Sequence, residues 1–217
     1  MDLLQSLQSR PCSILFIISA PSGAGKSSIC RKIKQKRENQ NCDYSISYTT
    51  RAPRRGEMEG EDYYFISESR FKEMIKNNEF AEWELVHDNF YGTPKSEIAK
   101  AFTIHHDLLL DIDVKGAGKL RKLYPDAVYI YIFPPSFSEL KARLEKRMTE
   151  SSEQVKKRFS NAIVELSYFV DYDYFVFNDD LEIAVNKINA IIEIEKNRIS
   201  RIPNRMDIKS QIMNLSM

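Results

Sequence analysis

The chain has 217 residues, and its 32 Lys and Arg nearly balance its 31 Asp and Glu, so the formal net charge at pH 7 is +1. A hydrophobic content of 42% argues against a disordered protein, and the near-neutral charge argues against a general binder of nucleic acid or other polyanions. The three cysteines, Cys12, Cys30 and Cys42, have no CxxC spacing, so they indicate neither a disulfide framework nor a zinc site.

The N-terminus lacks the features of an export signal, with Asp2 present and no basic residue before Arg10. The first apolar run covers only residues 14–18, whereas about 20 apolar residues are needed to span a bilayer. We therefore expect a cytoplasmic protein with no membrane partner.

Four apolar runs predict buried strands, and each is followed by a helical pattern. The predicted strands cover residues 14–18, 108–112, 128–133 and 174–177, and the predicted helices cover residues 26–37, 114–123, 136–147 and 181–199. Alternating strands and helices form right-handed βαβ units, so the pattern predicts an α/β fold with a parallel sheet flanked by helices.

The middle of the chain has a different pattern. Residues 62–66 and 80–87 predict strands of a smaller sheet, and a short helix is expected to begin at Pro94. We interpret the whole chain, 1–217, as one domain. Its parts are a core (about 12–48, 105–145 and 158–200), an inserted lobe (about 49–104), a polar lid without regular structure (about 146–157) and a polar tail (201–217).

A phosphate-binding loop follows the first predicted strand and opens the first helix. The sequence Ala20-Pro21-Ser22-Gly23-Ala24-Gly25-Lys26-Ser27 matches G-x-x-x-x-G-K-[ST], except that Ala20 replaces the first Gly; Ser28 comes next. In such loops backbone N–H groups surround the phosphates of ATP, the Lys reaches the β- and γ-phosphates and the hydroxyl ligates Mg²⁺. An ordinary strand–helix turn is the alternative. Ala20 fits only if its φ is negative.

Two carboxylates end the second predicted strand. Asp111 and Asp113 are two residues apart and therefore share one face of a strand. In P-loop proteins an Asp at this place commonly orients Mg²⁺, here through water. The alternative is a charged strand end in which Asp113 caps the next helix.

A compact cationic loop lies between these two motifs. Arg51, Arg54 and Arg55 surround Pro53, and guanidinium groups bind phosphate through paired hydrogen bonds. The loop therefore indicates a second phosphate site, although a solvated basic loop is the ordinary interpretation of a charge run.

Taken together, the motifs resemble those of guanylate kinase. They run in order as APSGAGKSS, SYTTRAPRRGE, GEDYYF, FAEW, YGT, LLLDID, an Arg-bearing lid and FNDDL, and they span residues 14–199. The resemblance implies a P-loop NTPase core with a GMP-binding lobe and a lid. It also implies the transfer of a phosphoryl group from MgATP to GMP, which yields ADP and GDP.

The resemblance further implies a role for individual residues. The ATP site would comprise residues 20–28. The GMP site would comprise Ser47, Arg51, Arg54, Glu57, Tyr63, Glu82, Tyr91, Thr93 and Asp113. The catalytic set would comprise Lys26, Arg143, Arg147 and Arg158, and Mg²⁺ would be held by Ser27 and, through water, by Asp111.

Hydrogen bonding supports the guanine assignment. The N1–H and N2–H₂ groups of guanine are adjacent donors that one carboxylate accepts, and the hydroxyl of Ser47 or Thr93 would donate to O6. For Glu82 alone, a structural role beside Trp83 is the alternative. Any single helix-surface arginine would ordinarily be solvated.

Two other functions remain open. Guanylate-kinase-like domains also act as non-catalytic binding modules, which do not need the Lys26 and Ser27 that this chain keeps. A kinase with another acceptor, such as AMP, is the second alternative. The sequence predicts neither the oligomeric state nor a role for the tail.

Overall fold

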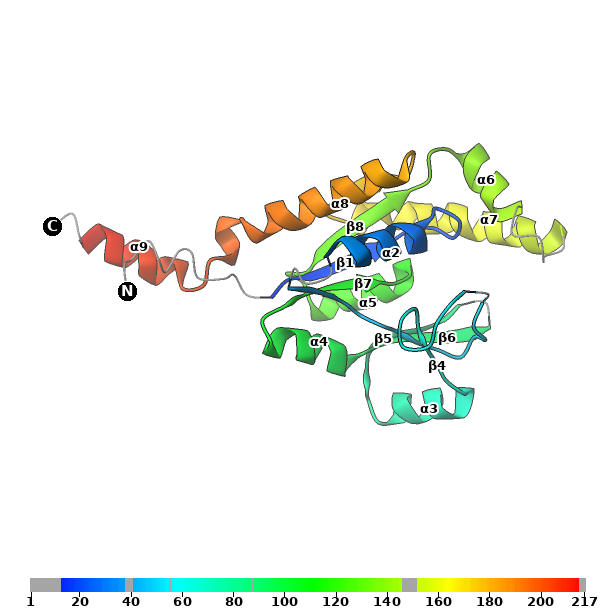
Figure 1. Ribbon diagram of the computed structural model, residues 1–217, viewed down its shortest axis with the longest axis horizontal. Helices are drawn as coiled ribbons and strands as arrows, with labels where there is room; N and C mark the ends of the chain where they lie inside the picture. The colour runs from blue at the N-terminus through cyan, green and yellow to red at the C-terminus, as the bar shows by residue number, and fades with distance from the viewer. Residues whose placement is uncertain (1–12, 38–40, 55, 87, 146–151, 215–217) are drawn as a thin grey trace.

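The computed structural model describes residues 13–37, 41–54, 56–86, 88–145 and 152–214 (Figure 1). Its larger sheet has five strands in the order β2-β7-β1-β8-β9, and every neighbouring pair is parallel. The strands are β1 (Leu15–Ser19), β2 (Cys42–Tyr44), β7 (Asp107–Asp111), β8 (Val128–Phe133) and β9 (Tyr174–Phe177). The predicted α/β fold with a parallel sheet is therefore confirmed.

Helices cover both faces of this sheet, because its central strands are apolar on both sides. Along β1, Phe16 and Ile18 pack toward α2 (Lys26–Arg37) and α8 (Leu181–Lys196). Alternate side chains of a strand point to opposite faces, so Leu15 and Ile17 belong to the second core, with α4 (Lys95–Thr103) and α5 (Val114–Leu123). A continuous apolar run is typical of such a doubly covered strand.

A second sheet forms a small lobe, which we define as residues 48–94. Its strand order is β4-β3-β6-β5, with β3 (Tyr48–Thr49), β4 (Tyr64–Phe65), β5 (Phe80–Val86) and β6 (Asn89–Pro94). Helix α3 (Glu68–Lys76) covers this sheet, and its Phe71 stacks on Phe80 and Phe90 at ring-centroid distances of 4.5 and 5.2 Å. In Figure 1 the small lobe lies below the main sheet and α2.

The structure corrects the prediction for part of the lid. Helix α7 (Ser152–Leu166) begins six residues before Arg158, so residues 152–157 are helical. Val155, Phe159 and Leu166 pack against a cluster that contains Leu144 of α6 (Phe137–Glu145). This apolar spacing of four and seven residues is helical, but the polar residues around Val155 hide it. Residues 146–151 lie outside the described part of the chain.

Most boundaries of the predicted core elements are confirmed within two residues, but the prediction for the lobe was incomplete. The predicted strand 62–66 was too long, since only β4 is extended there, and the strands β2, β3 and β6 and the helix α3 were not predicted. The strands β3 and β4 have two residues each, too few for a pattern of alternation.

The C-terminal region continues past α8 through a 3₁₀ turn, η2 (Ile199–Arg201), to α9 (Arg205–Asn214). The polar tail is therefore largely helical, and α9 extends beyond the end of the main sheet (Figure 1). None of the helices in the described ranges is long and apolar enough to cross a bilayer.

Candidate active site

The loop between β1 and α2 turns tightly around two glycines. Gly23 and Gly25 have φ values of +91° and +92°, a region that L side chains rarely adopt, and the N–H of Ala24 donates to the carbonyl of Pro21 at 3.1 Å. Ala20 is absent from the positive-φ residues of the described chain, so it fits the first position of the loop without strain. The turn places Lys26, Ser27 and Ser28, at the start of α2, in the wall of the cavity described below.

The loop is also held by Asn178, which directly follows the edge strand β9 at the same carboxyl end of the sheet. The buried side-chain amide of Asn178 donates to the carbonyl of Ala24 at 2.7 Å, and Arg143 of α6 donates to the same carbonyl at 3.4 Å. A Cβ on Gly25 would collide with the Asn178 amide. Gly25 is thus required both for its φ and for this close approach.

Helix α7 holds the loop at Ser22. The N–H of Ser22 donates to Glu165 Oε2 at 2.8 Å, and Arg158 Nη2 donates to Ser22 Oγ at 3.1 Å. Arg158 and Glu165 are seven residues apart, two helical turns, and therefore share one face of α7. The hydroxyl of Tyr131 on β8 donates to the carbonyl of Glu165 at 2.9 Å and fixes the helix to the sheet.

Lys26 points across the sheet toward Asp111 at the end of β7. Its Nζ lies 2.5 Å from Asp111 Oδ1 and donates to the carbonyl of Ile112 at 2.6 Å. Burial alone would lower the pKa of Lys26, but the attraction and hydrogen bond of Asp111 outweigh it, so that the pKa is raised. Tyr44 donates to the other oxygen of Asp111 at 3.3 Å.

The cationic loop is organised around Glu57. Arg51 Nη2 donates to Glu57 Oε1 at 2.9 Å, while the backbone N–H of Arg54 donates to Glu57 Oε2 at 2.7 Å. Arg51 Nε also donates to the hydroxyl of Tyr91 at 3.1 Å. The side chain of Arg54 stays exposed, so of these two arginines it is the one with an unburied guanidinium.

Tyr63 and Tyr91 join this loop to the sheet of the small lobe. Their rings meet edge to face at a centroid distance of 5.9 Å, and the guanidinium of Arg51 lies 5.5 Å from the ring centroid of Tyr63. Burial and the nearby Asp111 raise the pKa of Tyr63, so its phenol stays a hydrogen-bond donor at neutral pH.

Glu82 and Asp113 form a pair of neighbouring carboxylates in the cavity wall. Glu82, on β5, is 6% exposed and accepts a 2.6 Å hydrogen bond from Thr93 of β6. Asp113 caps α5, with its Oδ1 accepting from the N–H groups of Lys115 and Gly116 at 2.8 and 3.0 Å. A Cβ on Gly116 would lie 2.5 Å from one oxygen of Glu82, so glycine allows the two acids to approach.

Burial, opposed by the Thr93 hydrogen bond and assisted by the charge of Asp113, raises the pKa of Glu82 to about 7. The buried acid therefore takes up a proton at a higher pH than an exposed glutamate does. The hydroxyl of Thr93 already donates to Glu82, so Ser47 is the predicted hydroxyl left to donate to a further acceptor.

One cavity of about 240 Å³ brings most of the predicted residues together. Its lining contains, from the predicted sets, Ala20, Pro21, Ser22, Gly23, Gly25, Lys26, Ser27, Ser28, Ser47, Arg54, Tyr63, Glu82, Tyr91, Asp111, Asp113 and Arg158. Five predicted residues do not line this cavity but form hydrogen bonds around it: Ala24, Arg51, Glu57, Thr93 and Arg143. Arg147 lies outside the described residues.

The residues predicted to hold Mg²⁺ fit that ion. Ser27 and Asp111 line the same cavity and offer a hydroxyl and a carboxylate oxygen, the hard ligands that Mg²⁺ prefers. No group of three or more His, Cys, Asp or Glu among the described residues could form a metal cage. The set therefore suits a cation that is mostly coordinated by phosphates and water.

Three residues of this site were missed by the sequence analysis as individuals: Tyr44, Glu165 and Asn178. Asn178 could have been found, because polar residues at the carboxyl ends of parallel strands commonly face the ligand. Nothing local marks Glu165, whose partner Ser22 is 143 residues away in sequence.

Comparisons with known proteins show which proteins the chain resembles. A family model described as Guanylate kinase matches residues 13–195. A guanylate kinase of Clostridioides difficile is 44% identical over 88% of this chain and 92% of its own length, and one of Caldanaerobacter subterraneus is 47% identical over 87% and 90%. A crystal structure of guanylate kinase from Anaplasma phagocytophilum superposes with a TM-score of 0.76 at 31% identity, covering 94% of this chain and 95% of that one.

Proposed function

The chain belongs to the guanylate kinase family and transfers the γ-phosphoryl group of ATP to GMP, and from this premise we propose how its residues divide the work. The observation that carries the proposal is the single cavity lined by both the Lys26 loop and the Glu82–Asp113 pair. Transfer in line requires the donor and acceptor phosphates to meet in one space.

We assign the ATP phosphates to the loop of residues 20–28. Its two positive-φ glycines bring the backbone close to a phosphate, and the first turn of α2 adds the positive end of a helix dipole. Lys26 would leave Asp111 and bind the β- and γ-phosphates. In the reaction a GMP phosphate oxygen forms a bond to the γ-phosphorus, and the bond from that phosphorus to the β–γ bridging oxygen breaks, which leaves ADP.

We assign the GMP phosphate to the cationic loop. Arg54, whose guanidinium is exposed beside the cavity, and the phenols of Tyr63 and Tyr91 would bind its oxygens. Arg51 would contribute a second guanidinium, and Glu57 would hold the backbone between them in place. Because the acceptor phosphate is already an anionic nucleophile, no general base is required.

We assign guanine to Glu82, Asp113 and Ser47. The free oxygen of each carboxylate would accept from the N1–H and N2–H₂ edge, and Ser47 would donate to O6. Adenine has an acceptor at N1, so it would leave a buried carboxylate unpaired. This difference in hydrogen bonding is the basis of selection against AMP.

Mg²⁺ would be held by Ser27 and by Asp111 through water, and it would neutralise charge on the nucleotide phosphates. Arg158 and Arg143, which already contact the loop, would stabilise negative charge on the transferred group, with Arg147 added from the predicted lid (146–157). The nucleotide substrates are intracellular, so we place the activity in the cytoplasm.

Calorimetric titration of ADP and GMP into the wild-type protein and three variants, Tyr63→Phe, Ser47→Ala and Ser22→Ala, tests these assignments. We expect Tyr63→Phe and Ser47→Ala to weaken GMP binding about threefold to tenfold and to leave ADP binding unchanged, since each removes one hydrogen bond. Ser22→Ala, on the donor side, should leave GMP binding unchanged. Weakening of ADP but not GMP by Tyr63→Phe would contradict the assignment of the two subsites.

The alternatives are each disfavoured by a particular observation. A binding module has no use for a lysine held at 2.5 Å from the strand-end acid, ready to meet a phosphate. An adenine acceptor would face two acids that offer it only acceptors. The same titrations with AMP provide the check.

A further inference from the structure

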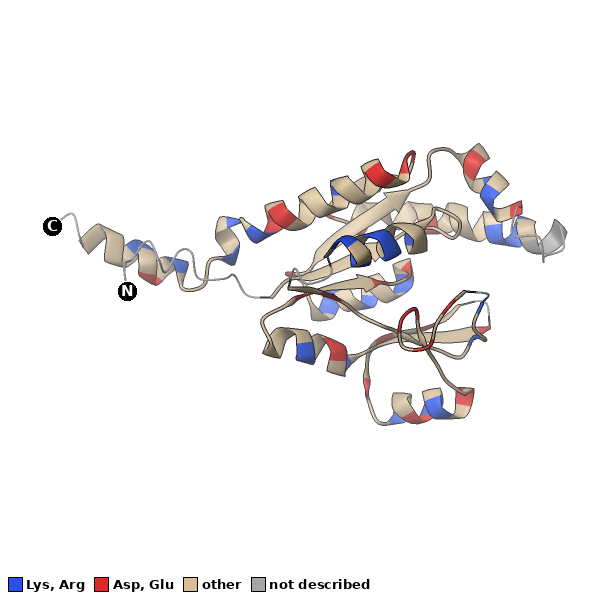
Figure 2. Ribbon diagram, in the orientation of Figure 1, with Lys and Arg blue, Asp and Glu red and all other residues tan. Residues whose placement is uncertain are grey.

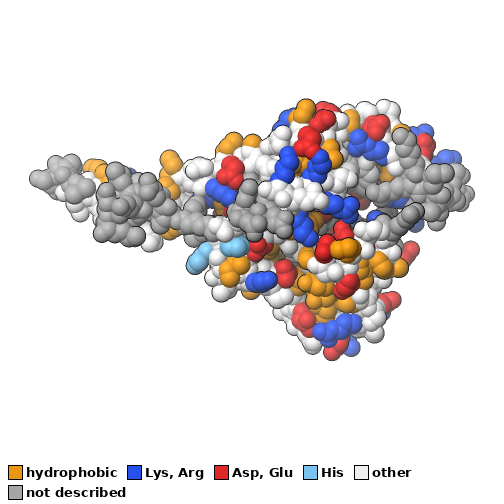
Figure 3. Space-filling model, viewed as in Figure 1, with side chains coloured by type: hydrophobic (Ala, Val, Ile, Leu, Met, Phe, Trp, Pro, Cys, Tyr) orange, Lys and Arg blue, Asp and Glu red, His pale blue; other side chains and the backbone are white. Residues whose placement is uncertain are grey.

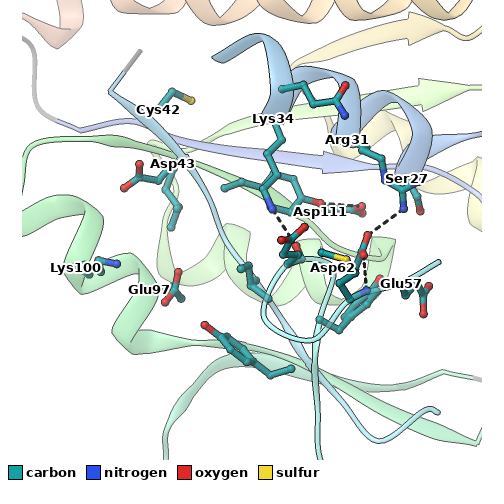
Figure 4. Close-up of a pocket in the computed structure, with 18 of the residues that line it drawn as sticks. Ser27, Arg31, Lys34, Cys42, Asp43, Glu57, Asp62, Glu97, Lys100 and Asp111 are labelled. Atoms are coloured by element: carbon teal, nitrogen blue, oxygen red, sulfur yellow. Dashed lines mark hydrogen bonds and ion pairs between the residues drawn. The ribbon is translucent and has the colours of Figure 1, made fainter. Parts of the chain in front are cut away.

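A second, larger cavity separates α2 from the acceptor loop of the small lobe. It measures about 1090 Å³ and is lined by α2 on one side and residues 56–64 on the other (Figure 4). Its lining contains charged residues of both signs. The ribbon of Figure 2 is coloured for basic residues along α2 and for acidic residues in the loop of the small lobe below it, and Figure 3 shows basic and acidic side chains close together on this face. This mixture of charges does not suit a ligand with charge of a single sign. It does allow ion pairs and hydrogen bonds between the two walls of the cavity.

Two basic side chains of α2 cross this cavity. Arg31 Nη2 donates to Asp62 Oδ1 at 3.0 Å, and Lys34 Nζ donates to the carbonyl of Glu61 at 3.0 Å (Figure 4). These contacts join the core directly to the small lobe. We name the set Arg31, Lys34, Glu61 and Asp62 the α2 bridge.

The lobe end of the bridge is part of the acceptor loop itself. The second oxygen of Asp62 accepts from the N–H of Met58 at 2.9 Å and closes the turn of residues 58–62. Tyr63, assigned above to the GMP phosphate, is the next residue. Because Asp62 and Tyr63 are adjacent, the contact that holds Asp62 also restrains the position of Tyr63.

The core end of the bridge is on the helix that begins at the ATP loop. Arg31 follows Ser27 by four residues, one helical turn, so the two share a face of α2, and Ser27 lines both cavities. One rigid helix thus carries the donor-phosphate ligands at its start and the attachment of the acceptor loop one turn later.

We propose that Arg31 and Lys34 are positioning residues that set the distance between the donor and acceptor phosphate sites by fixing the acceptor loop to α2. The proposal rests on the assignment of Tyr63 to the GMP phosphate. Without the bridge the lobe occupies arrangements in which the loop is too far from α2, and GMP binds only to the remaining fraction.

The expected effect is modest, because the Arg31 side chain is 58% exposed and such pairs are screened by solvent. We expect Arg31→Ala to raise the GMP KM about twofold to fivefold, with the ATP KM and the melting temperature unchanged. Arg31→Glu should have a larger effect because it repels Asp62, and Arg31→Lys should restore most of the wild-type value.

Steady-state kinetics at 50 mM and 500 mM KCl, with GMP and ATP varied separately, test the proposal. Asp62→Asn keeps an acceptor for Met58 but loses the charge, so the Arg31→Ala/Asp62→Asn double variant should be no worse than either single one. The matched control is Lys36→Ala, which removes an α2 lysine paired with Glu182 and Asn186 of α8, within the core. We expect it to leave the GMP KM unchanged.

Equal GMP KM values for wild type, Arg31→Ala and Arg31→Glu would contradict the positioning role of the α2 bridge. Additive effects of Arg31→Ala and Asp62→Asn, or the same KM rise in Lys36→Ala, would also overturn it. A normal GMP affinity in Tyr63→Phe would instead refute the subsite assignment on which the bridge rests. The two failures are therefore distinguishable.

Discussion

Lys26 Nζ lies 2.5 Å from Asp111 Oδ1, so the lysine of the phosphate loop and the acid of the predicted magnesium site neutralise each other. In the proposed reaction, Lys26 binds the ATP phosphates and Asp111 holds Mg²⁺ through water. Under the proposed assignment, binding of MgATP would therefore separate them. The ATP phosphates would replace Asp111 as the partner of Lys26, and the cation would replace Lys26 as the partner of Asp111.

Lys26→Ala should lower kcat by about a hundredfold to a thousandfold, the loss typical when one group that stabilises transition-state charge is removed. The fold should persist, since Asp111 keeps the hydrogen bond from Tyr44. Coupled measurement of ADP release, with circular dichroism on the same sample, checks both statements. A variant that retains the wild-type kcat would remove Lys26 from the mechanism.

Asp111→Asn should raise the affinity for metal-free ADP and reduce the gain in ADP affinity that Mg²⁺ provides. Without its charge, Lys26 is free to meet phosphate and the loop repels anions less, so metal-free ADP in EDTA should bind several-fold more tightly than to wild type. The gain in ADP affinity on adding Mg²⁺ should shrink. Titration calorimetry with and without Mg²⁺ measures both, and a weaker metal-free affinity would show that the ion pair does not restrain Lys26.

Glu82 predicts the pH dependence of GMP binding. Its pKa in the free protein is raised to about 7, whereas a carboxylate is needed to accept from guanine. Binding therefore competes with protonation, so the GMP KM should rise as pH falls below about 7 and level off above it. The GMP phosphate titrates near pH 6, and Glu82→Gln isolates that contribution because it lacks the carboxyl titration. A KM profile with the same inflection near 7 in Glu82→Gln would assign it to another group.

Glu165 predicts a coupling between α7 and the phosphate loop. Glu165→Ala removes the acceptor for the Ser22 N–H and should raise the ATP KM about threefold to tenfold, while Glu165→Gln keeps an acceptor and should largely restore it. The GMP KM is expected to stay constant. If Glu165→Gln is as impaired as Glu165→Ala, the charge rather than the hydrogen bond is what matters.

The core of the fold was predictable because its strands are continuous apolar runs. Residues 128–133 and 174–177 were predicted with the bounds of β8 and β9, because both are runs of apolar and aromatic residues. The strand β8 is buried along most of its length, as expected for a strand covered on both faces, whereas Phe175 and Phe177 of the edge strand β9 are exposed. The strands β3 and β4 leave no such pattern, because two residues cannot alternate. The strand β3 depends on pairing with Gly92 and Tyr91, more than 40 residues away in sequence, and β4 depends in turn on pairing with β3.

The site was predictable where a motif carries its own chemistry. The Lys26 loop and the Asp111 strand end follow from spacing alone, whereas the guanine set depended on the resemblance. Glu165 and Asn178 were not predictable as ligands of the loop, because their contacts arise from the packing of α7 and from the strand order of the sheet. The start of α7 was missed because its apolar residues are widely separated.

The proposed function requires that one cavity join an ATP phosphate loop to a pocket that selects guanine. ADP release measured with MgATP and a panel of GMP, AMP, CMP and UMP tests it most directly. We predict turnover with GMP and a kcat/KM for AMP lower by about 10⁴-fold, as expected when buried acceptors are left unpaired. A kcat/KM for AMP within tenfold of that for GMP would contradict it.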